Sequence, residues 1–376
     1  MKRIFLVEIE PILNYPPVLS ILNILCRNGY RVVLCVSKFP HELGEMQNEY
    51  NFKVIDYGNE FSNYESNSKK IFKLLGMRQF MWDNIDKQYQ DGDIIWCCSV
   101  VSLKCLGKRL LSKKYVLQIF ELIENLYYIN TLKIGKIDLP RFCQKAHKVI
   151  VCEYNRAHIT QAWYKLSELP TVLNNKSYDD YVTKKNSIYT IEDKAIIQKL
   201  NKIKDKKIVL YQGIIGKERP LGQFIDAVNE LGNDYEMVIM GKGAEEYEKY
   251  TSRNLTCIPF IAPPKYLEVT SNAYIGILTY VVDYSSCLSE LNPIYCAPNK
   301  IFEYSRFGIP MIGNDIPGLR YTISYNKMGE CIEDFNKDLI KEAIQKIEND
   351  YDSYSKNAIE FYKNVDNEKI IKEIID

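Results

Sequence analysis

The sequence has no long hydrophobic run and almost no excess of charge. No stretch approaches the roughly 18 apolar residues that a membrane-spanning helix needs. The apolar run near the start is broken by Glu8 and Glu10 and is too short for a signal peptide. The 49 basic and 48 acidic residues leave a net charge of +1, which argues against bulk electrostatic binding to nucleic acid. We therefore expect a cytoplasmic protein without a nucleic-acid partner.

Patterns typical of metal or disulfide chemistry are also missing. The 11 cysteines are an odd number with no C-x-x-C, so we expect reduced, buried thiols. The three histidines, His41, His147 and His158, are too scattered for a zinc site. Asp91 and Asp93 match the metal-binding D-x-D of a different transferase fold, but they directly precede an expected strand. We interpret them as a polar turn and predict neither a metal nor a cofactor.

What the sequence does contain is a regular alternation of apolar runs and helical patterns. Hydrophobic residues make up 46% of the 376 residues, which is ordinary for a globular protein but long for one core. Near-continuous apolar strands alternating with helices predict parallel sheets covered on both faces. The expected strands are 4–9, 30–37, 52–57, 93–100, 115–121, 147–153, 207–213, 235–241, 255–261, 273–280 and 309–315.

The alternation stops over a polar segment near residues 170–206 and then restarts. The predicted fold class is α/β, with two Rossmann-like, doubly wound parallel-sheet domains facing across a cleft. We place the first domain at 1–170, a linker and the start of the second domain at 171–206, and the second domain at 207–350. A C-terminal helix over 351–376 is expected to pack back toward the first domain. Ligands bind at the carboxyl ends of such strands, so the residues just after each strand carry the functional argument.

Two strands of the second domain run into glycine-containing loops. The strand at 207–213 leads through Gly213 and Gly216 to Arg219 and Pro220, where a helix is expected. A helix N-terminus with a nearby arginine is suited to an anion, although an ordinary turn with a surface arginine explains the pattern equally well. The strand at 235–241 runs into Gly241-Lys242-Gly243, which by itself is weaker evidence and fits a structural turn.

The most informative segment is residues 292–313, which contains a helix beginning after Pro298. Asn299, Lys300 and Glu303 fall in its first turns, and residues three or four apart are neighbours on a helix. A lysine at a helix N-terminus opposes the helix dipole, so another interaction is expected to hold it there. A diphosphate is one candidate.

The segment P-N-K-I-F-E-Y-x-x-x-G-I-P, which begins at Pro298, resembles the C-terminal donor motif of retaining GT-B glycosyltransferases of the family-four-like group, also called glycosyl transferases group 1. Three further segments resemble other elements of that family in the same order: Phe120-Glu121-Leu122, the strand and loop at 211–221, and V-I-M-G-K-G at 238–243. A segment from Val151 through His158 to Lys176 resembles the crossing toward the linker. Together they cover most of residues 110–320.

The resemblance implies a role for each candidate residue. Arg219 and Lys300 would hold the donor diphosphate and act in catalysis, and Glu121 would position the acceptor. The first domain would then bind the acceptor and the second the nucleotide sugar, of UDP or GDP type. The remaining donor-binding candidates are Gly213, Gly216, Gly241, Gly243, Pro298, Asn299 and Glu303, with Glu303 on the ribose. His158 is a weaker candidate on the acceptor side.

The sequence also departs from the family pattern. The first glutamate of the family's E-x7-E would stand at position 295, where this chain has Tyr295. That glutamate commonly contacts the donor sugar, so the identity of the sugar does not carry over. The basic pair after the first strand of the second domain is reduced to Lys217 and Arg219, and Glu121 follows Phe120 instead of a histidine.

The resemblance implies metal-independent transfer of a sugar, with retention, to a saccharide or lipid-linked saccharide acceptor in surface polysaccharide assembly. Peripheral contact with the inner face of a membrane would accompany a lipid-linked acceptor. The basic stretch Lys108–Lys114 could serve that contact, although a solvated face is the simpler interpretation. Two alternatives stay open: a nucleotide-sugar epimerase of the same architecture, and a non-catalytic subunit that binds nucleotide sugar.

Overall fold

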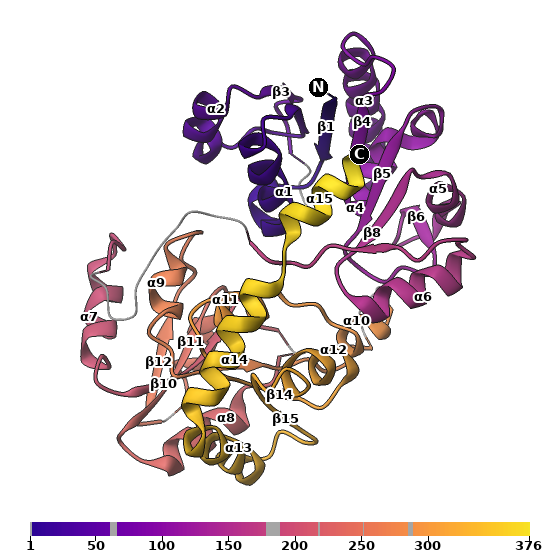
Figure 1. Cartoon of the computed structure of the whole chain (residues 1–376). Helices are drawn as coiled ribbons and strands as arrows, with labels where there is room; N and C mark the ends of the chain where they lie inside the picture. Colours follow the sequence, from indigo (N-terminus) through magenta and orange to yellow (C-terminus); the bar gives the residue numbers. More distant parts are fainter. Residues whose placement is uncertain (1, 61–65, 178–188, 217–218, 251, 285–288) are drawn as a thin grey trace. The chain divides into compact units, whose positions relative to one another are not determined.

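A computed structural model describes residues 2–60, 66–177, 189–216, 219–250, 252–284 and 289–376 (Figure 1). The chain divides into two compact units. Of the described residues, the first unit contains those within 2–177, Ser289 and 366–376, and the second contains those within 189–284 and 290–365. No helix among the described residues is long and apolar enough to cross a membrane.

The first unit is built on a seven-stranded parallel sheet in the order β3-β2-β1-β4-β5-β8-β9. Its central strands are buried along almost their whole length, as the continuous apolar runs predict. The strands are β1 (Arg3–Glu8), β2 (Arg31–Val36), β3 (Lys53–Asp56), β4 (Ile94–Cys98), β5 (Tyr115–Ile119), β8 (Lys148–Val151) and β9 (Thr171–Val172).

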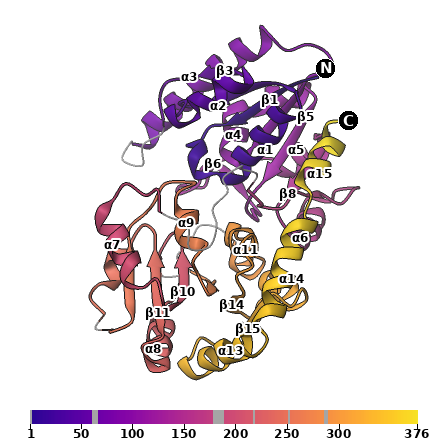
Figure 2. The same ribbon diagram turned by 60° about the vertical axis from the view of Figure 1, so that its left-hand side comes forward.

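Helices cover both faces of this sheet (Figures 1 and 2). One face packs against α3 (Asn67–Asp86) and α4 (Ser99–Leu106), and the other against α1 (Pro16–Arg27) and α15 (Asn367–Ile375). The hairpin of β6 (Leu126–Ile129) and β7 (Ile134–Ile137) was not predicted. The remaining helices are η1 (Ile12–Asn14), η2 (His41–Leu43), α2 (Gly44–Tyr50), η3 (Gly107–Ser112), α5 (Leu139–Lys145) and α6 (Tyr154–Tyr164).

The second unit repeats the plan with a six-stranded parallel sheet in the order β12-β11-β10-β13-β14-β15. Its strands are β10 (Lys207–Gln212), β11 (Tyr235–Met240), β12 (Leu255–Ile258), β13 (Ile275–Leu278), β14 (Met311–Asn314) and β15 (Gly329–Ile332). Its helices are α7 (Lys194–Lys202), α8 (Gly222–Leu231), η4 (Ala244–Tyr247), α9 (Tyr266–Thr270), α10 (Leu291–Ile294), α11 (Asn299–Ser305), α12 (Pro317–Leu319), η5 (Arg320–Ser324), α13 (Lys337–Asn349) and α14 (Tyr351–Asn364).

All eleven expected strands are present, and the predicted α/β fold with two parallel sheets is confirmed. The strands β9 and β15 were missed because neither is a continuous apolar run: β9 has two residues, and β15 contains Glu330. The C-terminal segment also differs from the prediction of one helix. Asp366 accepts a hydrogen bond from the Lys369 backbone N–H and caps a new helix, so the segment forms α14 in the second unit and α15 in the first.

Candidate functional site

Two loops meet at the carboxyl edge of the second sheet, where β10 and β11 end. Gly213 and Gly241 both have positive φ, +120° and +145°. A Cβ placed on Gly241 would lie 1.9 Å from the Gly213 carbonyl oxygen, so only glycine allows the two loops to approach this closely. The Ile215 N–H also donates to the Lys242 carbonyl at 3.3 Å. The two glycine turns that the sequence suggested separately therefore form one joined platform, and Gly243 adds a third positive φ of +94° to it.

Lys300 and Arg219 come together beside the ring of Tyr280, which follows β13. The Lys300 Cε lies 3.2 Å from the position of a Cβ on Gly213, so the lysine lies against the loop. Its Nζ is 4.1 Å from the Tyr211 ring centroid and 5.6 Å from that of Tyr280. The Arg219 Cζ is 3.9 Å from the Tyr280 centroid. The aromatic faces attract both cations and hold them at the same edge of the sheet.

Tyr280 is a residue that the sequence analysis missed. Burial raises the pKa of its phenol well above the usual value, so the ring is neutral where the two cations contact it. Its backbone is anchored to Asn314 at the end of β14: the Tyr280 N–H donates to the side-chain oxygen at 3.1 Å, and the Asn314 amide donates back to the Tyr280 carbonyl at 2.7 Å. Nothing in the local sequence indicates that Tyr280 lies next to Lys300 and Arg219, because the three residues belong to separate segments: the loop after β13, helix α11 and the turn before α8.

Glu303 belongs to a buried polar network behind the platform. The carboxylate is only 8% exposed, and it accepts hydrogen bonds from the Gln212 side-chain amide and from the Tyr266 hydroxyl, the latter at 2.7 Å. The Thr270 hydroxyl in turn donates to the Gln212 side-chain oxygen at 2.6 Å.

The other donor-side candidates lie around the same helix and loop. Pro298 is the N-cap of α11, and Asn299 is its first residue. Gly216 accepts a hydrogen bond from the Arg219 backbone N–H at 2.9 Å, which closes the turn that carries the arginine. Tyr295 ends α10, and its backbone packs against Gly318 so closely that a Cβ on the glycine would lie 2.9 Å from the Tyr295 carbonyl carbon. Lys217 lies outside the described residues.

The acceptor-side candidates, Glu121 and His158, both lie in the first unit but have different partners. Glu121 follows β5, and its half-exposed carboxylate pairs at 3.3 Å with Arg156 of α6. The Arg156 guanidinium, only 5% exposed, also donates to the Phe120 carbonyl. His158 is exposed on α6 and contacts the Tyr154 ring at 4.7 Å between centroids. Residues two apart do not face each other on a helix, so Arg156 and His158 point in different directions.

A buried carboxyl that was not predicted lies at the same edge of the first sheet. Glu8 ends β1 with its side chain fully buried. Its Oε1 accepts hydrogen bonds from the hydroxyls of Ser99 and Ser102, at 3.0 and 3.3 Å, and from the Glu10 N–H at 3.0 Å. Its Oε2 has no hydrogen-bond partner. Burial, the largest cause, raises the pKa of Glu8 to about 8, so the carboxyl is protonated at neutral pH.

Strain accompanies this carboxyl. Ser99 has a φ of +68°, which a residue with a side chain rarely adopts. The Tyr15 hydroxyl donates to the Glu10 carboxylate at 2.7 Å, and its ring lies 5.6 Å from that of Phe120. The sequence indicated this site only by a glutamate in an expected buried strand. The surroundings of that glutamate depend on β4 and α4, and no local pattern indicates that they lie next to it.

The polar features that the sequence analysis set aside have local structural partners. Asp93 accepts hydrogen bonds from the backbone N–H groups of Arg3 and Gln90, at 3.1 and 2.9 Å, as a polar turn requires. Arg109 and Lys113 of the basic stretch both pair with Asp86 of α3. The ten cysteines that the structure describes are free thiols, nine of them buried. Among the described residues, no group of three or more His, Cys, Asp or Glu side chains could hold a metal ion.

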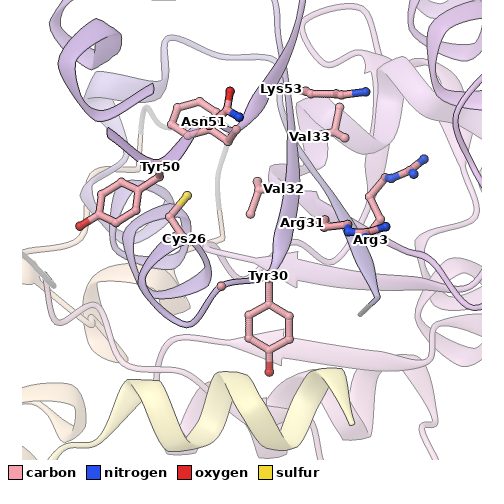
Figure 3. Close-up of a pocket in the computed structure, with 11 residues that line it drawn as sticks. Arg3, Cys26, Tyr30, Arg31, Val32, Val33, Tyr50, Asn51 and Lys53 are labelled. Atoms are coloured by element: carbon pink, nitrogen blue, oxygen red, sulfur yellow. The ribbon is translucent and has the colours of Figure 1, made fainter. Parts of the chain in front are cut away.

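A cavity of about 450 Å³ lies in the first unit, at the amino ends of β1, β2 and β3 (Figure 3). Arg3 and Arg31, which are register partners, line it together with Lys53, Tyr30 and Tyr50. None of the predicted site residues lines it. It therefore lies at the opposite edge of the sheet from Glu8 and Glu121.

Comparisons with known proteins identify the fold. No family model and no curated protein sequence matches the chain. Solved structures do match it over nearly their whole length, and three of them are given as examples. Sucrose-phosphate synthase from Thermosynechococcus elongatus has a TM-score of 0.66 at 14% identity, with 99% of this chain and 97% of that chain covered. HepE from Anabaena, in complex with UDP-glucose, gives 0.63 at 12% identity, with 100% and 98% covered. WaaG, a glycosyltransferase involved in lipopolysaccharide biosynthesis, gives 0.58 at 13% identity, with 99% and 98% covered. The chain therefore has the GT-B architecture of two Rossmann-like units.

Proposed function

We propose that the protein is a glycosyltransferase that transfers a sugar from a nucleotide-activated donor to a saccharide or lipid-linked saccharide acceptor. The observation that carries this proposal is the meeting of Arg219 and Lys300 beside Tyr280, over the joined glycine platform. Two cations at the carboxyl edge of a doubly wound sheet favour a phosphate-bearing ligand. The solved complex of HepE with UDP-glucose, which has the same fold, supports the choice of a nucleotide sugar.

The chemistry follows from the charges at this edge. The bond between the anomeric carbon and the diphosphate oxygen breaks, and a bond from the acceptor oxygen to the same carbon forms. The acceptor hydroxyl gives its proton to the departing diphosphate. Negative charge grows on the leaving group, and Arg219 and Lys300 would stabilise it in place of a divalent metal. Retention of configuration and metal independence are part of this proposal.

The remaining roles are assigned on the same basis. Glu303 would accept the ribose hydroxyls, with Gln212 and Tyr266 fixing its orientation. The glycines of the platform would let backbone amides approach the diphosphate and the base. Glu121, on the first unit, would position the acceptor, with Arg156 holding its carboxylate. We further propose surface polysaccharide assembly as the biological setting, and the involvement of WaaG in lipopolysaccharide biosynthesis supports it.

Calorimetric titration tests the nucleotide site. UDP, GDP and ADP, and then the corresponding nucleotide sugars, are titrated into the parent chain, Lys300→Ala and a matched control, Lys346→Ala, whose ion pair with Glu330 lies on the surface. We expect micromolar binding to the parent and the control, and much weaker binding to Lys300→Ala. Failure of every nucleotide to bind below millimolar concentration would contradict the proposal.

Product analysis separates the two alternatives. An epimerase would interconvert a free nucleotide sugar without an acceptor, whereas a transferase would release nucleoside diphosphate. Because Tyr295 stands where the family has a glutamate, a non-catalytic subunit remains an alternative function. Such a subunit would bind the donor but release no diphosphate, either by hydrolysis or by transfer.

A further inference from the structure

The cavity at the amino ends of β1, β2 and β3 takes no part in the proposed sugar transfer. Its volume of about 450 Å³ falls within the range of small-molecule sites. It lies between the turn that joins α1 to β2 and the turn that joins α2 to β3, so the residues that line it all belong to the first unit. Among the described residues that line it, three are basic and none is acidic. The cavity is therefore suited to an anion.

The three basic residues, Arg3, Arg31 and Lys53, extend from one face of the sheet. Arg3 and Arg31 are register partners on neighbouring strands. Lys53 is the register partner of Val33, which lies two residues after Arg31 and therefore on the same face. In Figure 3 the three basic side chains extend to one side of the strand that carries Val33, whereas Tyr50 lies on the other side. Like charges on register partners are destabilising, and an anion between them would remove that cost.

Two of these cations have no partner of their own within the part of the chain that the structure describes. Neither Arg31 nor Lys53 forms an ion pair or a side-chain hydrogen bond there, and both residues are exposed. Arg3 differs from them, because its guanidinium donates to the Gln88 carbonyl and lies 3.9 Å from the Asp93 carboxylate. Arg31 and Lys53 are therefore the groups available to a ligand, and Arg3 is held in place beside them.

The helix that ends beside the cavity does not account for the exposed cations. A basic side chain often bonds to the last carbonyls of a helix, and α1 ends at Arg27, shortly before Arg31. However, the carbonyls of Ile24, Leu25 and Cys26 already accept hydrogen bonds from backbone N–H groups of the following turn, at 3.0 to 3.1 Å. Arg31 is thus not required to complete the end of α1.

We propose that this cavity binds a small phosphate ester, whose phosphate group is held by Arg31 and Lys53. A phosphate group carries a charge of about −1.5 to −2 at neutral pH, which balances two cations, whereas a carboxylate balances only one. The guanidinium of an arginine also matches the geometry of phosphate oxygens. Strand geometry places the Cα atoms of Arg31 and Lys53 roughly 8 Å apart, a gap that two long side chains can close around one phosphate.

The rest of the cavity favours an ester over a free phosphate ion. The cavity is much larger than a phosphate ion, and its other side is lined by Val32, Phe52 and Cys26, all of them buried. Burial raises the pKa of the Cys26 thiol to about 12, so this side is neutral as well as apolar. The organic part of the ester would lie there. This inference goes beyond the proposed sugar transfer and does not rest on it, because the candidate donor residues belong to the second unit.

Calorimetric titration of the full chain with phenyl phosphate tests the proposal. The titration is carried out on the Lys300→Ala chain, so that the candidate diphosphate site contributes little. Arg31→Gln and Lys53→Gln, each added to that chain, should weaken the binding of phenyl phosphate about tenfold or more, because each removes a charge-assisted hydrogen bond. Phenyl sulfate, which carries a single charge, should bind more weakly than phenyl phosphate to the Lys300→Ala chain. Lys346→Gln, at a surface lysine of the second unit, is the matched control and should change nothing.

Thermal melting provides a second measurement. In phosphate-free buffer, Arg31→Gln should melt at or above the temperature of the parent, because it removes the repulsion from Arg3. Phenyl phosphate should then raise the melting temperature of the parent more than that of Arg31→Gln. The UDP affinity of Arg31→Gln should equal that of the parent, so a failure at this cavity leaves the proposed nucleotide site intact.

Three results would overturn the assignment of the cavity. The first is the absence of phenyl phosphate binding to the Lys300→Ala chain. The second is unchanged affinity for phenyl phosphate after both Arg31→Gln and Lys53→Gln. The third is equal stabilisation of Arg31→Gln and the parent by phenyl phosphate, since the bound anion would then lie elsewhere on the protein.

Discussion

The carboxyl edges of the two sheets have the same topology but different electrostatic character. At the edge of the second sheet, Lys300 and Arg219 contact the neutral ring of Tyr280, and the nearby Glu303 is hydrogen-bonded by its neighbours. At the edge of the first sheet, carboxyl groups dominate, and Glu8 is buried with one oxygen unpartnered. The second edge is suited to an anionic ligand, whereas the first, where Glu8 is protonated and Glu121 is paired with Arg156, is suited to neutral hydroxyl groups.

Similar folds do not determine which ligand binds, because the side chains that follow the strands do. Duplicated Rossmann-like topology provides two edges that are equally open to ligands. Among the residues that the structure describes, only those of the second edge include cations beside close-packed glycine loops. The first offers hydrogen-bond acceptors and a proton-bearing carboxyl, which suit the hydroxyl groups of a neutral sugar.

The largest expected effect concerns the protonated carboxyl of the first edge. Because the pKa of Glu8 is raised from 4.5 to about 8, the folded state keeps a proton that the unfolded chain loses. Between these two values the folded state binds more protons, so the parent's stability falls as pH rises, by about 1.4 kcal/mol per unit from this group. Glu8→Gln removes that slope. Chemical denaturation of both proteins at pH 5 to 9 measures the difference, which should reach several kcal/mol.

Glu121→Gln is the control for this measurement because its carboxylate is 46% exposed. The free energy of unfolding of Glu121→Gln should change with pH between 5 and 9 as that of the parent does. A constant difference between Glu8→Gln and the parent from pH 5 to 9 would mean that Glu8 is ionised in the folded protein, and the first edge would then hold a buried negative charge instead of a proton-bearing carboxyl.

The cations of the second edge should matter chiefly for catalysis. Lys300→Ala and Arg219→Ala should each lower kcat on the order of 10²-fold or more, as expected when one donor is removed from a preorganised anion site. Their effects should combine less than additively because both serve one diphosphate. Initial rates of donor hydrolysis or transfer measure this, with Lys346→Ala as the control. Near-parental kcat in both single variants would remove their catalytic role.

Glu303→Gln tests whether Glu303 binds the nucleotide or only holds a structural hydrogen-bond network. Glu303→Gln keeps the shape of the side chain but removes the charge. Losing charge-assisted bonds to the ribose should cost about 1.5–3 kcal/mol of nucleotide binding. Calorimetry with the best-binding nucleotide measures the loss, and a thermal melt monitors the fold. A destabilised variant with unchanged nucleotide affinity would limit Glu303 to holding Gln212 and Tyr266.

The smallest expected effect is that of chelation. If Arg219 and Lys300 provide the electrostatic role of a metal, turnover in EDTA should equal turnover in untreated buffer. The assay is repeated with magnesium and with manganese added back. Loss of turnover in EDTA with recovery on either addition would show that a divalent ion completes the second edge.

The sequence by itself determined the two parallel sheets, because continuous apolar runs of strand length recur along the whole chain. It also indicated Gly213, Gly241, Lys300 and Glu303 as residues that follow or face strand ends, since motif spacing is local. Only the tertiary structure decided that Tyr280 lies beside both Lys300 and Arg219, and that Ser99 and Ser102 both donate hydrogen bonds to Glu8. Those contacts join residues roughly 20 to 90 positions apart in the sequence, and neither periodicity nor spacing carries information about them.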